Sequence, residues 1–517
     1  MFNLSLICLL LYATQICDGY KVLVMFAMPG KSFSFLGNGV VRHLLEAGHE
    51  VTYITPFPNS LKKNPLLREI DISSLQVDIP KDMINIEKIM KKEVDMQNIF
   101  SLVIDVQTLA ITHDAVTQLL NDPKEQFDVV IMGWMFSELS SGLAAVFNCP
   151  YIWVSTVDPH WMVLQLIDEV TNPAYTADAT SSTVVPFSFT QRVTQLMNLV
   201  MGLSFQKLYG AGIERDAYER LFVPFIQKRG HKVPDLEELR YNSSLMLGNS
   251  HVSMGHPIRL PQNYKAVGGY HIDAKVKPLP EDLKKLLDNA KNGLIYFSMG
   301  SNLRSKHLPM EVKTGLLKIF GKLKQTVLWK FEEDLPNRPN NVHILQWAPQ
   351  QSILAHPNCV LFITHGGILS TTETIHFGKP IIGIPVFGDQ FNNVDRAVNR
   401  GFAKRVDLSL SMADDLEKAI NDILTDPSYT AKVKLLSLIY HDRPVSPGKE
   451  LAHWVEHVVR TGGAPHLRSP ALMVPWYQKW FLDLAALIIA VLFALKLIIK
   501  KLYRSFISKN PPKKKTL

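Results

Sequence analysis

Short apolar runs alternate with longer amphipathic segments along most of the chain, and this alternation predicts strands that are each followed by a helix. The runs are rich in Val, Ile and Leu, as expected of strands that are buried on both faces of a parallel sheet. The pattern therefore predicts an α/β protein. Eight runs are predicted to be strands: 21–26, 50–55, 128–132, 151–155, 294–298, 342–346, 359–364 and 380–386.

Helical periodicity occupies the segments between these strands. A loop, PGKSFSFLGNG, is expected after the first strand, with a helix then running to about residue 47. Long helical stretches are predicted near 86–120 and 189–228, and further helices over 427–460. The segment 171–186 is polar and rich in Thr, Ala and Ser, which is typical of a mobile loop over a pocket.

A proline-rich connector at 275–280 divides the chain into two such α/β halves. A length of 517 residues is enough for two to three domains. The composition predicts a first Rossmann-like domain at 20–274, a linker at 275–290 and a second Rossmann-like domain at 291–465.

Both ends of the chain predict targeting to a membrane. Residues 1–19 have a short apolar core and small residues at the end, which predicts a cleaved signal peptide. The run FLDLAALIIAVLFALKLII at 481–499 is almost wholly apolar, and 19 residues of helix span about 28 Å, close to the thickness of a bilayer core. Trp476, Tyr477 and Trp480 precede it as an aromatic belt.

The basic balance of the chain comes from its C-terminal tail. Eight Lys or Arg residues and no acidic residue lie from Lys496 onward, and the formal net charge of the whole chain is +8. The basic charge is therefore a sign of membrane topology and predicts no nucleic-acid partner. It places the tail 500–517 in the cytosol and the body in the lumen, as in a single-pass type I protein.

Two short signals refine this location. Lys514 and Lys515 lie four and three positions from the end, which resembles the dilysine retrieval signal of endoplasmic reticulum membrane proteins; the alternative is a generic basic anchor. Asn242 begins an Asn-Ser-Ser sequon that a lumenal body makes usable for glycosylation. Cys149 and Cys359 lie in different halves, so no disulfide framework is expected.

The segment from Trp347 to Gln390 carries the chemistry. A buried strand runs into the turn His365-Gly366-Gly367, and a helix is expected from about Ser370. The helix N-terminus leaves unpaired backbone N–H groups at the carboxyl end of the strand, where open α/β sheets bind anionic ligands. The two glycines allow a phosphate to approach closely. His365 can donate to a phosphate oxygen, and Ser370 can add a hydroxyl.

The other polar residues of this segment suit the rest of a nucleotide sugar. The carboxylate of Glu373 can accept both hydroxyls of a ribose, and the flat indole of Trp347 can stack on a base. Asp389 and Gln390 end the last strand and can bracket sugar hydroxyls. The alternative is an ordinary strand-helix-strand unit whose glycines only make turns.

These 44 positions closely resemble the signature of the UDP-glycosyltransferase family, and a weaker resemblance spans essentially the whole chain. The resemblance implies two facing Rossmann-like domains, the glycosyltransferase GT-B architecture, followed by one C-terminal transmembrane helix. It also implies a role in donor binding for each matching residue. These are Trp347 (uracil), Gln350 (nucleoside), Ser301 and His365 (diphosphate), Glu373 (ribose), and Asp389 with Gln390 (transferred sugar).

The acceptor half departs from the family pattern. The family's general base is a histidine in a sequence such as GKSH, and here Phe33 stands at that place; its supporting acid would lie at Gly133. Three interpretations are open: the acceptors need little base help, another residue such as His160 or Glu138 substitutes, or the chain binds UDP-sugar without turnover. The catalytic residues are therefore unknown. Leu369, where vertebrate members often have asparagine, is a lesser departure.

We therefore expect a lumenal, membrane-anchored enzyme that transfers a hexosyl group from a UDP-sugar to small lipophilic acceptors, as in detoxification. UDP-glucose is the first choice of donor and UDP-glucuronate the second, and inversion is implied by the resemblance. The alternative is a non-catalytic UDP-sugar-binding paralogue. UDP-sugar is a co-substrate, and no cofactor is expected. No metal is expected either, because no His or Cys cluster has metal-ligand spacing. A homo-oligomer remains an open alternative.

Overall fold

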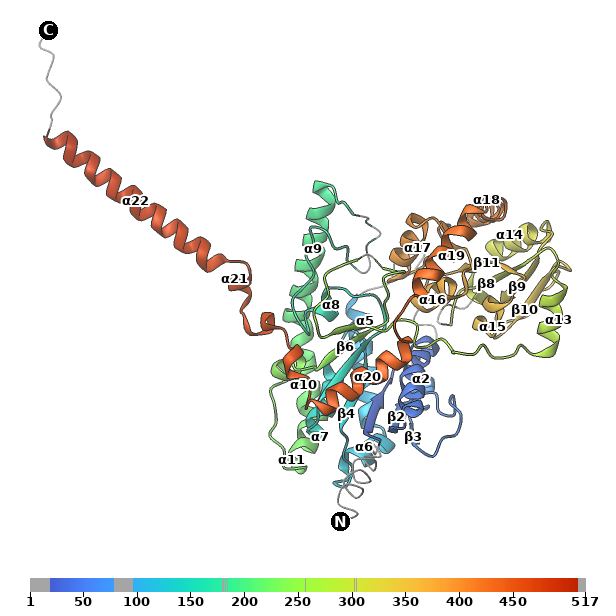
Figure 1. Ribbon diagram of the computed structural model, residues 1–517, viewed down its shortest axis with the longest axis horizontal. Coiled ribbons are helices and arrows are strands. Elements are labelled where there is room, and N and C mark those ends of the chain that lie inside the picture. Colours follow the sequence, from blue (N-terminus) through green and yellow to red (C-terminus); the bar gives the residue numbers. More distant parts are fainter. Residues whose placement is uncertain are drawn as a thin grey trace, which may run out of the picture.

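The computed structural model describes residues 19–78, 96–178, 181, 183, 185–255, 257–301, 303 and 305–509. The signal peptide predicted at 1–19 lies outside these residues, apart from its last one. Figure 1 shows two α/β domains side by side, with one long helix extending away from them. The predicted fold class is confirmed.

The first domain is built on a parallel seven-stranded sheet in the order β3-β2-β1-β4-β5-β6-β7. The strands read as apolar runs because helices cover both faces; β1, for example, buries four of its five residues. The strands are β1 (Lys21–Met25), β2 (Glu50–Thr55), β3 (Leu67–Asp71), β4 (Val129–Trp134), β5 (Tyr151–Ser155), β6 (Leu245–Gly248) and β7 (Tyr264–Ala266).

The helices of this domain lie in the predicted helical stretches, but each long stretch is divided into shorter helices. The described part of 86–120 forms two helices that meet at His113, and 189–228 forms three helices with a π-turn after the first. The helices are α2 (Lys31–Glu46), α3 (Leu75–Asp78), α5 (Met96–Thr112), α6 (Asp114–Asn121), α7 (Gly142–Phe147), α8 (Trp161–Leu164), α9 (Phe189–Phe205), α10 (Ala211–Leu221), α11 (Val223–Lys228) and α12 (Leu236–Arg240), with η1 (Leu139–Ser141) and the π-turn η2 (Gln206–Gly210).

The second domain repeats the architecture with six parallel strands in the order β10-β9-β8-β11-β12-β13. This is the strand order of a dinucleotide-binding fold, in which the order reverses between the first and fourth strands. The strands are β8 (Leu294–Ser298), β9 (Thr326–Lys330), β10 (Val342–Leu345), β11 (Cys359–Thr364), β12 (Ile381–Gly383) and β13 (Ala403–Arg405). Its helices are α13 (Glu281–Asn289), α14 (Met310–Gly321), α15 (Gln350–Ala355), α16 (Ile368–Phe377), α17 (Gln390–Asn399), α18 (Met412–Thr425) and α19 (Ser428–His441), with the short turn η3 (Ser305–His307).

The last helix of the globular body, α20 (Pro447–Arg460), returns to the first domain. Its apolar face, with Leu451, Val455 and Val458, is buried in the same core cluster as the β1 strand. Residues at the C-terminal end of the predicted second domain thus complete the core of the first. This crossing ties the two domains together.

After α20 the chain continues through η4 (Pro465–Leu467), η5 (Pro470–Met473) and α21 (Trp476–Lys479) into α22 (Leu482–Lys509). Over Leu482–Phe506, α22 is long and apolar enough to cross a membrane, with a mean hydropathy of 2.6. The apolar run predicted at 481–499 is therefore the first part of a longer helix, which projects from the body in Figure 1.

Several boundaries differ from the sequence-based expectation, and three of them lie next to predicted site residues. The predicted loop PGKSFSFLGNG is helical from Lys31, because Gly30 is extended and Phe33 and Leu36 are buried one helical turn apart. The helix expected from Ser370 begins at Ile368. The strand predicted at 380–386 is only Ile381–Gly383, and an irregular buried segment continues beyond it.

Candidate donor and acceptor site

The carboxyl ends of β8 and β11 lie next to each other where the strand order of the second sheet reverses. Ser298 is in register with Thr364, so the turns that follow the two strands face the same crevice. Gly300 has a positive φ of 82°, and a Cβ at this residue would come within 2.5 Å of the His365 ring. The glycine therefore lets the first turn approach His365 closely.

The turn before α16 is open at its helix N-terminus. Gly366 has a φ of 82°, and an added Cβ would lie 2.3 Å from Val394. Gly367 is the N-cap of α16 and supplies no side-chain cap. The first N–H groups of the helix are thus left for a ligand, and the positive end of the helix dipole favours an anionic one.

His365 is neutral in this turn. Burial, helped by the nearby Lys330 ammonium, lowers the pKa of His365 to about 4. Its Nδ1 is buried and has no hydrogen-bond partner among the described residues. A neutral imidazole can donate one hydrogen bond to a phosphate oxygen without needing protonation.

Glu373 is held by a set of amide side chains. Gln350 donates to Oε2 of Glu373 at 2.6 Å and to Ser370 Oγ at 3.1 Å, and Gln351 donates to the other carboxylate oxygen at 3.1 Å. His271 lies 3.7 Å from the same carboxylate. Burial raises the pKa of Glu373 to about 7. The structure thus brings together Gln350, Ser370 and Glu373, as predicted.

Sequence reasoning missed Gln351 and His271. Gln351 is adjacent to the predicted Gln350, and its amide oxygen accepts a hydrogen bond from Asp273 N at 3.1 Å. It therefore links the Glu373 carboxylate to the segment that leads into the connector between the domains. Adjacency to Gln350 was the only available signal for Gln351; none marked His271, because it is far away in sequence.

Trp347 is 46% exposed and meets the first domain. The Lys31 ammonium lies 3.9 Å from the centroid of its ring, and the Phe35 ring centre is 6.2 Å away. A second ammonium, that of Lys330, is 5.8 Å from the indole and donates to Gly300 O at 2.8 Å. The expected base-stacking surface is thus lined by cations from both domains.

At the other end of the crevice, Asp389 and Gln390 begin α17. Asn393 joins Asp389 to the turn, since its amide nitrogen donates to Asp389 Oδ2 at 2.7 Å and to Gly366 O at 3.0 Å. Burial and the nearby Asp158 raise the pKa of Asp389 to about 6. The amide oxygen of Gln390 accepts from the backbone N–H groups of Val386 and Phe387, so this residue also shapes the loop.

The first domain has apolar residues at the corresponding place, where the strand order of its sheet reverses between β1 and β4. Met25 and Met132 are in register on β1 and β4, so the segments that follow these strands are neighbours. The Phe33 ring is 5% exposed and packs 5.0 Å from Phe26. A Cβ at Gly133 would come within 2.5 Å of Phe33 Cζ. The phenyl ring thus fills the space that a side chain at 133 would need.

Leu369 of the second domain packs against the same apolar cluster that contains Phe33 and Phe26. Three departures from the family pattern, at Phe33, Gly133 and Leu369, are therefore close to one cluster. At these three positions the chain thus has nonpolar residues, two in the first domain and one in the second, where the family pattern has polar ones.

Glu138 and His160, the two predicted substitutes for the base, are both buried. Glu138 is 1% exposed, accepts from Trp134 Nε1 at 2.8 Å and pairs with Arg240 at 3.3 Å. The Trp134 ring lies beside His160, 5.6 Å between centroids, and His160 Nδ1 contacts Asp158 O at 2.9 Å. The indole of Trp134 thus makes contact with both candidate residues.

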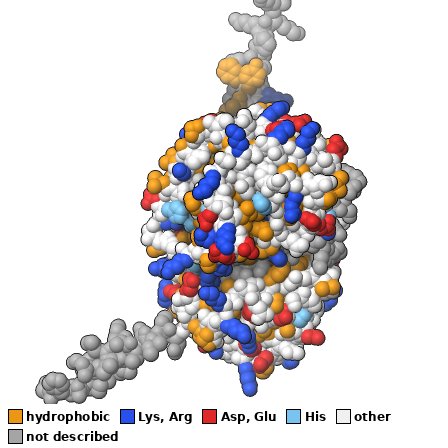
Figure 2. Space-filling model, turned by 90° about the vertical axis from the view of Figure 1, so that its right-hand side faces the viewer, with side chains coloured by type: hydrophobic (Ala, Val, Ile, Leu, Met, Phe, Trp, Pro, Cys, Tyr) orange, Lys and Arg blue, Asp and Glu red, His pale blue; other side chains and the backbone are white. Residues whose placement is uncertain are grey.

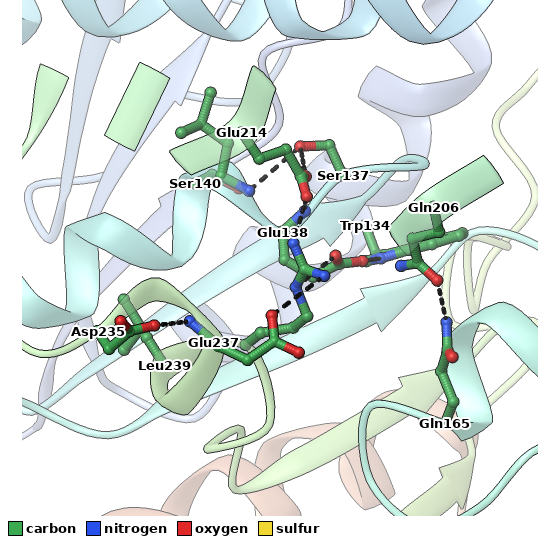
Figure 3. Close-up of polar contacts among 12 residues, drawn as sticks. Trp134, Ser137, Glu138, Ser140, Gln165, Gln206, Glu214, Asp235, Glu237 and Leu239 are labelled. Atoms are coloured by element: carbon green, nitrogen blue, oxygen red, sulfur yellow. Dashed lines mark hydrogen bonds and ion pairs between the residues drawn. The ribbon is translucent and has the colours of Figure 1, made fainter. Parts of the chain in front are cut away.

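Figure 3 shows Glu138 inside a buried polar network rather than at an open surface. Glu214 accepts from Ser137 Oγ at 2.5 Å and from Glu138 N at 3.0 Å, and it also pairs with Arg240. Burial raises the pKa of both carboxyls, that of Glu214 to about 7. Two carboxyls that share one guanidinium serve here to hold the domain together.

Figure 2 shows the hollow between the upper and lower lobes of the molecule, with Lys and Arg side chains gathered on one side. Polar contacts also cross between the domains: Arg396 of α17 pairs with Asp158 of the first domain, and Arg400 donates to Ser253 O at 2.6 Å. The predicted donor residues of the second domain thus lie on elements that contact the first domain, and two lysines lie beside Trp347.

The two facing Rossmann-like domains, with a glycine turn before α16 and the buried carboxyl of Glu373 on that helix, are the arrangement expected of a nucleotide-sugar transferase. The model of the family described as "UDP-glucoronosyl and UDP-glucosyl transferase" matches residues 21–516, and the chain belongs to this family. The resemblance inferred from the sequence is thus confirmed, and the chain is a transferase.

Relatives and solved structures agree with this assignment. The chain is similar to UDP-glucosyltransferase 2 of Dactylopius coccus, with 31% identity, covering 98% of this chain and 97% of that protein. It is also similar to UDP-glucuronosyltransferase 2B15 of Rattus norvegicus, with 27% identity over 91% of each. The glycotransferase of kitacinnamycin has a TM-score of 0.56 at 16% identity, covering 85% of this chain and 98% of that one, which shows the fold.

Proposed function

We propose that this chain is a membrane-anchored enzyme that transfers glucose from UDP-glucose to small lipophilic acceptors. The observation that carries the proposal is the set around Glu373. The Glu373 carboxylate accepts hydrogen bonds from Gln350 and Gln351 and can accept the hydroxyls of a ribose. It lies on α16, whose uncapped N-terminus is the proposed binding place of the diphosphate. Trp347, Ser301, Gly366, Gly367, Asp389 and Gln390 remain the predicted partners of the other parts of the donor.

The chemistry of the sugar end favours a neutral hexose over glucuronate. Asp389 presents a carboxyl group there and Asn393 holds it. A carboxylate accepts hydrogen bonds from the hydroxyls of glucose but repels the carboxylate of a glucuronosyl group when both are ionised. We therefore keep UDP-glucose as the first choice of donor.

In the proposed reaction a nucleophilic atom of the acceptor attacks C1 of the sugar as the bond from C1 to the diphosphate oxygen breaks. The helix N-terminus and neutral His365 stabilise the negative charge that develops on the leaving UDP. With attack from the face opposite to UDP, the configuration at C1 inverts.

The apolar cluster around Phe33 limits the acceptors. A buried phenyl ring cannot remove a proton, so acceptors that are already nucleophilic, such as thiols, amines, carboxylates or acidic phenols, should react best. The experiment is a UDP-release assay with UDP-glucose and a panel of such acceptors beside simple alcohols. Turnover of thiols, amines or acidic phenols above simple alcohols supports the proposal, and equal turnover of all classes contradicts the acceptor preference.

The second candidate function is a UDP-sugar-binding protein without turnover. The packing of Phe33 favours this second function. Its phenyl ring stands where the family has the base and fills the space that a carboxylate at Gly133 would need. Tight UDP-glucose binding together with no UDP release from any acceptor would support this second function.

We further propose that the chain lies in the endoplasmic reticulum membrane with a lumenal body. The support is the α22 helix and the basic tail that follows it, including Lys514 and Lys515, which lie outside the described residues. Replacing both lysines by Ser should let the full-length protein leave this membrane; unchanged localisation contradicts the retrieval signal. Loss of a glycan-dependent mass difference in Asn242→Gln would support lumenal exposure of the body.

A further inference from the structure

Most of the helix α9 is exposed in the part of the chain that the structure describes. Of its 17 residues only Gln195 and Leu199 are buried. A helix of this length depends on burial of one apolar face for most of its stability. Either α9 is stable with little burial, or its exposed face is covered by something outside the described residues.

Large apolar side chains form a stripe along the exposed face of α9. They recur at the spacing of a helix, one or two per turn. Opposite them, Gln195 joins α9 to the body, accepting from Asp178 N at 2.8 Å and donating to Ser181 Oγ at 2.8 Å. The stripe, called here the α9 stripe, consists of Phe189 (73% exposed), Val193, Leu196, Met197 (56%), Val200 and Met201 (65%), and Leu208 (84%) extends it into the π-turn.

The charges on this segment have one sign. Arg192 and Lys207 are its only charged residues between Phe189 and Gly210, and no Asp or Glu lies there. A helix with apolar side chains on one face, basic residues, and no acidic ones matches helices that lie in the interface of a bilayer.

The chain before the membrane helix is pinned beside the segment that leads into α9. Ser469 Oγ donates to Asp168, and Arg468 donates to Tyr241 O and to the Asn242 side chain. Asp168 precedes the loop that enters α9, and Trp476 follows Ser469 by seven positions. The aromatic residues Trp476 and Trp480 are 65% and 59% exposed at the start of the membrane helix, as expected at the headgroup level.

The membrane surface is therefore held near this side of the first domain. Figure 1 shows α9 and α22 extending toward the same side of the body. We propose that the α9 stripe docks into the headgroup region of the same bilayer that α22 crosses. This proposal rests on the membrane anchorage of the proposed function and adds a second, interfacial contact from the catalytic body.

The test places a polarity-sensitive NBD label on single cysteines of the full-length protein. Met197→Cys lies in the α9 stripe, and Asn198→Cys lies about 100° further round the same helix, where the side chain is also exposed. Leu492→Cys lies in the middle of α22. The four native cysteines are first replaced by Ser or Ala; they are Cys8, Cys17, Cys149 and Cys359. UDP binding by calorimetry checks that each variant is folded.

Each labelled protein is reconstituted in nanodiscs that hold one chain, with lipids carrying a nitroxide at a shallow acyl position. The expected result is several-fold stronger quenching at Met197→Cys than at Asn198→Cys, with a blue-shifted emission that detergent dilution removes. Quenching at Leu492→Cys without any at Met197→Cys overturns the docking while the anchor stands. No quenching at Leu492→Cys shows that the anchor itself fails.

The alternative partner of the α9 stripe is a second copy of the chain. One-chain nanodiscs exclude such a contact. If the Met197→Cys label is shielded only in discs that hold two chains, and then without nitroxide quenching, the stripe is a protein interface and the membrane proposal is wrong.

Discussion

The two domains have the same kind of crevice at the point where their strand order reverses, but they fill it in opposite ways. In the second domain, β8 and β11 bring Gly300 beside His365, and polar groups remain available to a ligand. In the first domain, β1 and β4 bring Phe33 against Gly133, and apolar atoms close the space. The predicted donor site and the predicted place of the base thus lie in separate parts of one architecture.

The largest expected effect comes from opening the first crevice. Phe33→His with Gly133→Asp should raise turnover of simple phenols, because a positioned base typically contributes about 10²–10⁴-fold, of which an imperfect graft recovers part. Gly133→Asp alone should be destabilising, because its Cβ would meet Phe33 at 2.5 Å and Phe26 at 2.8 Å. The measurement is turnover at equal UDP-sugar saturation, with Tm for each variant.

Phe33→His alone is the control for this change, since an imidazole without its orienting carboxylate should restore little. The two substitutions should therefore be non-additive both in turnover and in Tm. Fast turnover of simple phenols by the unsubstituted protein would break the comparison between the domains, because a base would then be present elsewhere.

The second crevice is tested by removing its polar groups. His365→Ala and Glu373→Ala should each weaken UDP binding by about 1–3 kcal/mol, the scale of a lost hydrogen bond to a charged group, which is roughly 5–150-fold in Kd. Isothermal calorimetry measures the effect. Glu417→Ala, which removes an exposed carboxylate paired with Lys322 far along the same domain, is the matched control; equal losses in all three variants would contradict the site.

The pH dependence of donor binding tests the role of Glu373 in the same site. Burial raises the pKa of Glu373 to about 7 in the empty crevice, and ribose hydroxyls donate to the ionised carboxylate. Donor binding should then lower this pKa and release a proton, so affinity should rise several-fold from about pH 6 to about pH 8. UDP-glucose is the probe, because it lacks the secondary phosphate ionisation near pH 6.

Glu373→Gln should bind more weakly at high pH and lose the step near pH 7. A smaller step at lower pH should remain, because Asp389 has a pKa raised to about 6. An unchanged pH profile in Glu373→Gln would assign the titration to another group.

The smallest expected effect concerns the contact between Lys31 of the first domain and Trp347 of the second. Lys31→Met should weaken UDP-glucose binding by about two- to fivefold, the scale of about 0.5–1 kcal/mol for an exposed cation–π or ion contact. The ammonium lies beside the indole and can reach the anionic donor. Lys62→Met, an exposed lysine of the first domain, is the control; tighter binding by Lys31→Met would mean that the lysine competes with uracil for the indole.

Much of the second domain could be predicted from the sequence because its signals are local. A strand buried on both faces is a continuous apolar run, as at Cys359–Thr364, and a Gly-Gly turn marks the backbone that must approach a phosphate. His365, Ser370 and Glu373 follow within nine residues, so their common position needs only one strand, one turn and one helix.

Short edge strands and distant partners could not be predicted in this way. Strands β7 and β13 have three residues each, which is too short for a period to be visible. The start of α2 was placed too late because glycines in PGKSFSFLGNG suggested a loop, whereas Gly37 and Gly39 lie on a buried helix face where a Cβ would meet Phe26 and Tyr270. Packing against those rings overrides the low helix propensity of glycine.

The sequence by itself determined the fold class and the family, and it predicted the polar set of the donor crevice and the absence of the family's base, because each depends on residue types at fixed spacing along one segment. Only the tertiary structure decided that Phe33 fills the space above Gly133, that Gln351 and Lys31 join the donor site, and that α20 completes the first domain. These contacts join residues that are tens to hundreds of positions apart. Their geometry depends on how two sheets and their helices pack, which no local pattern specifies.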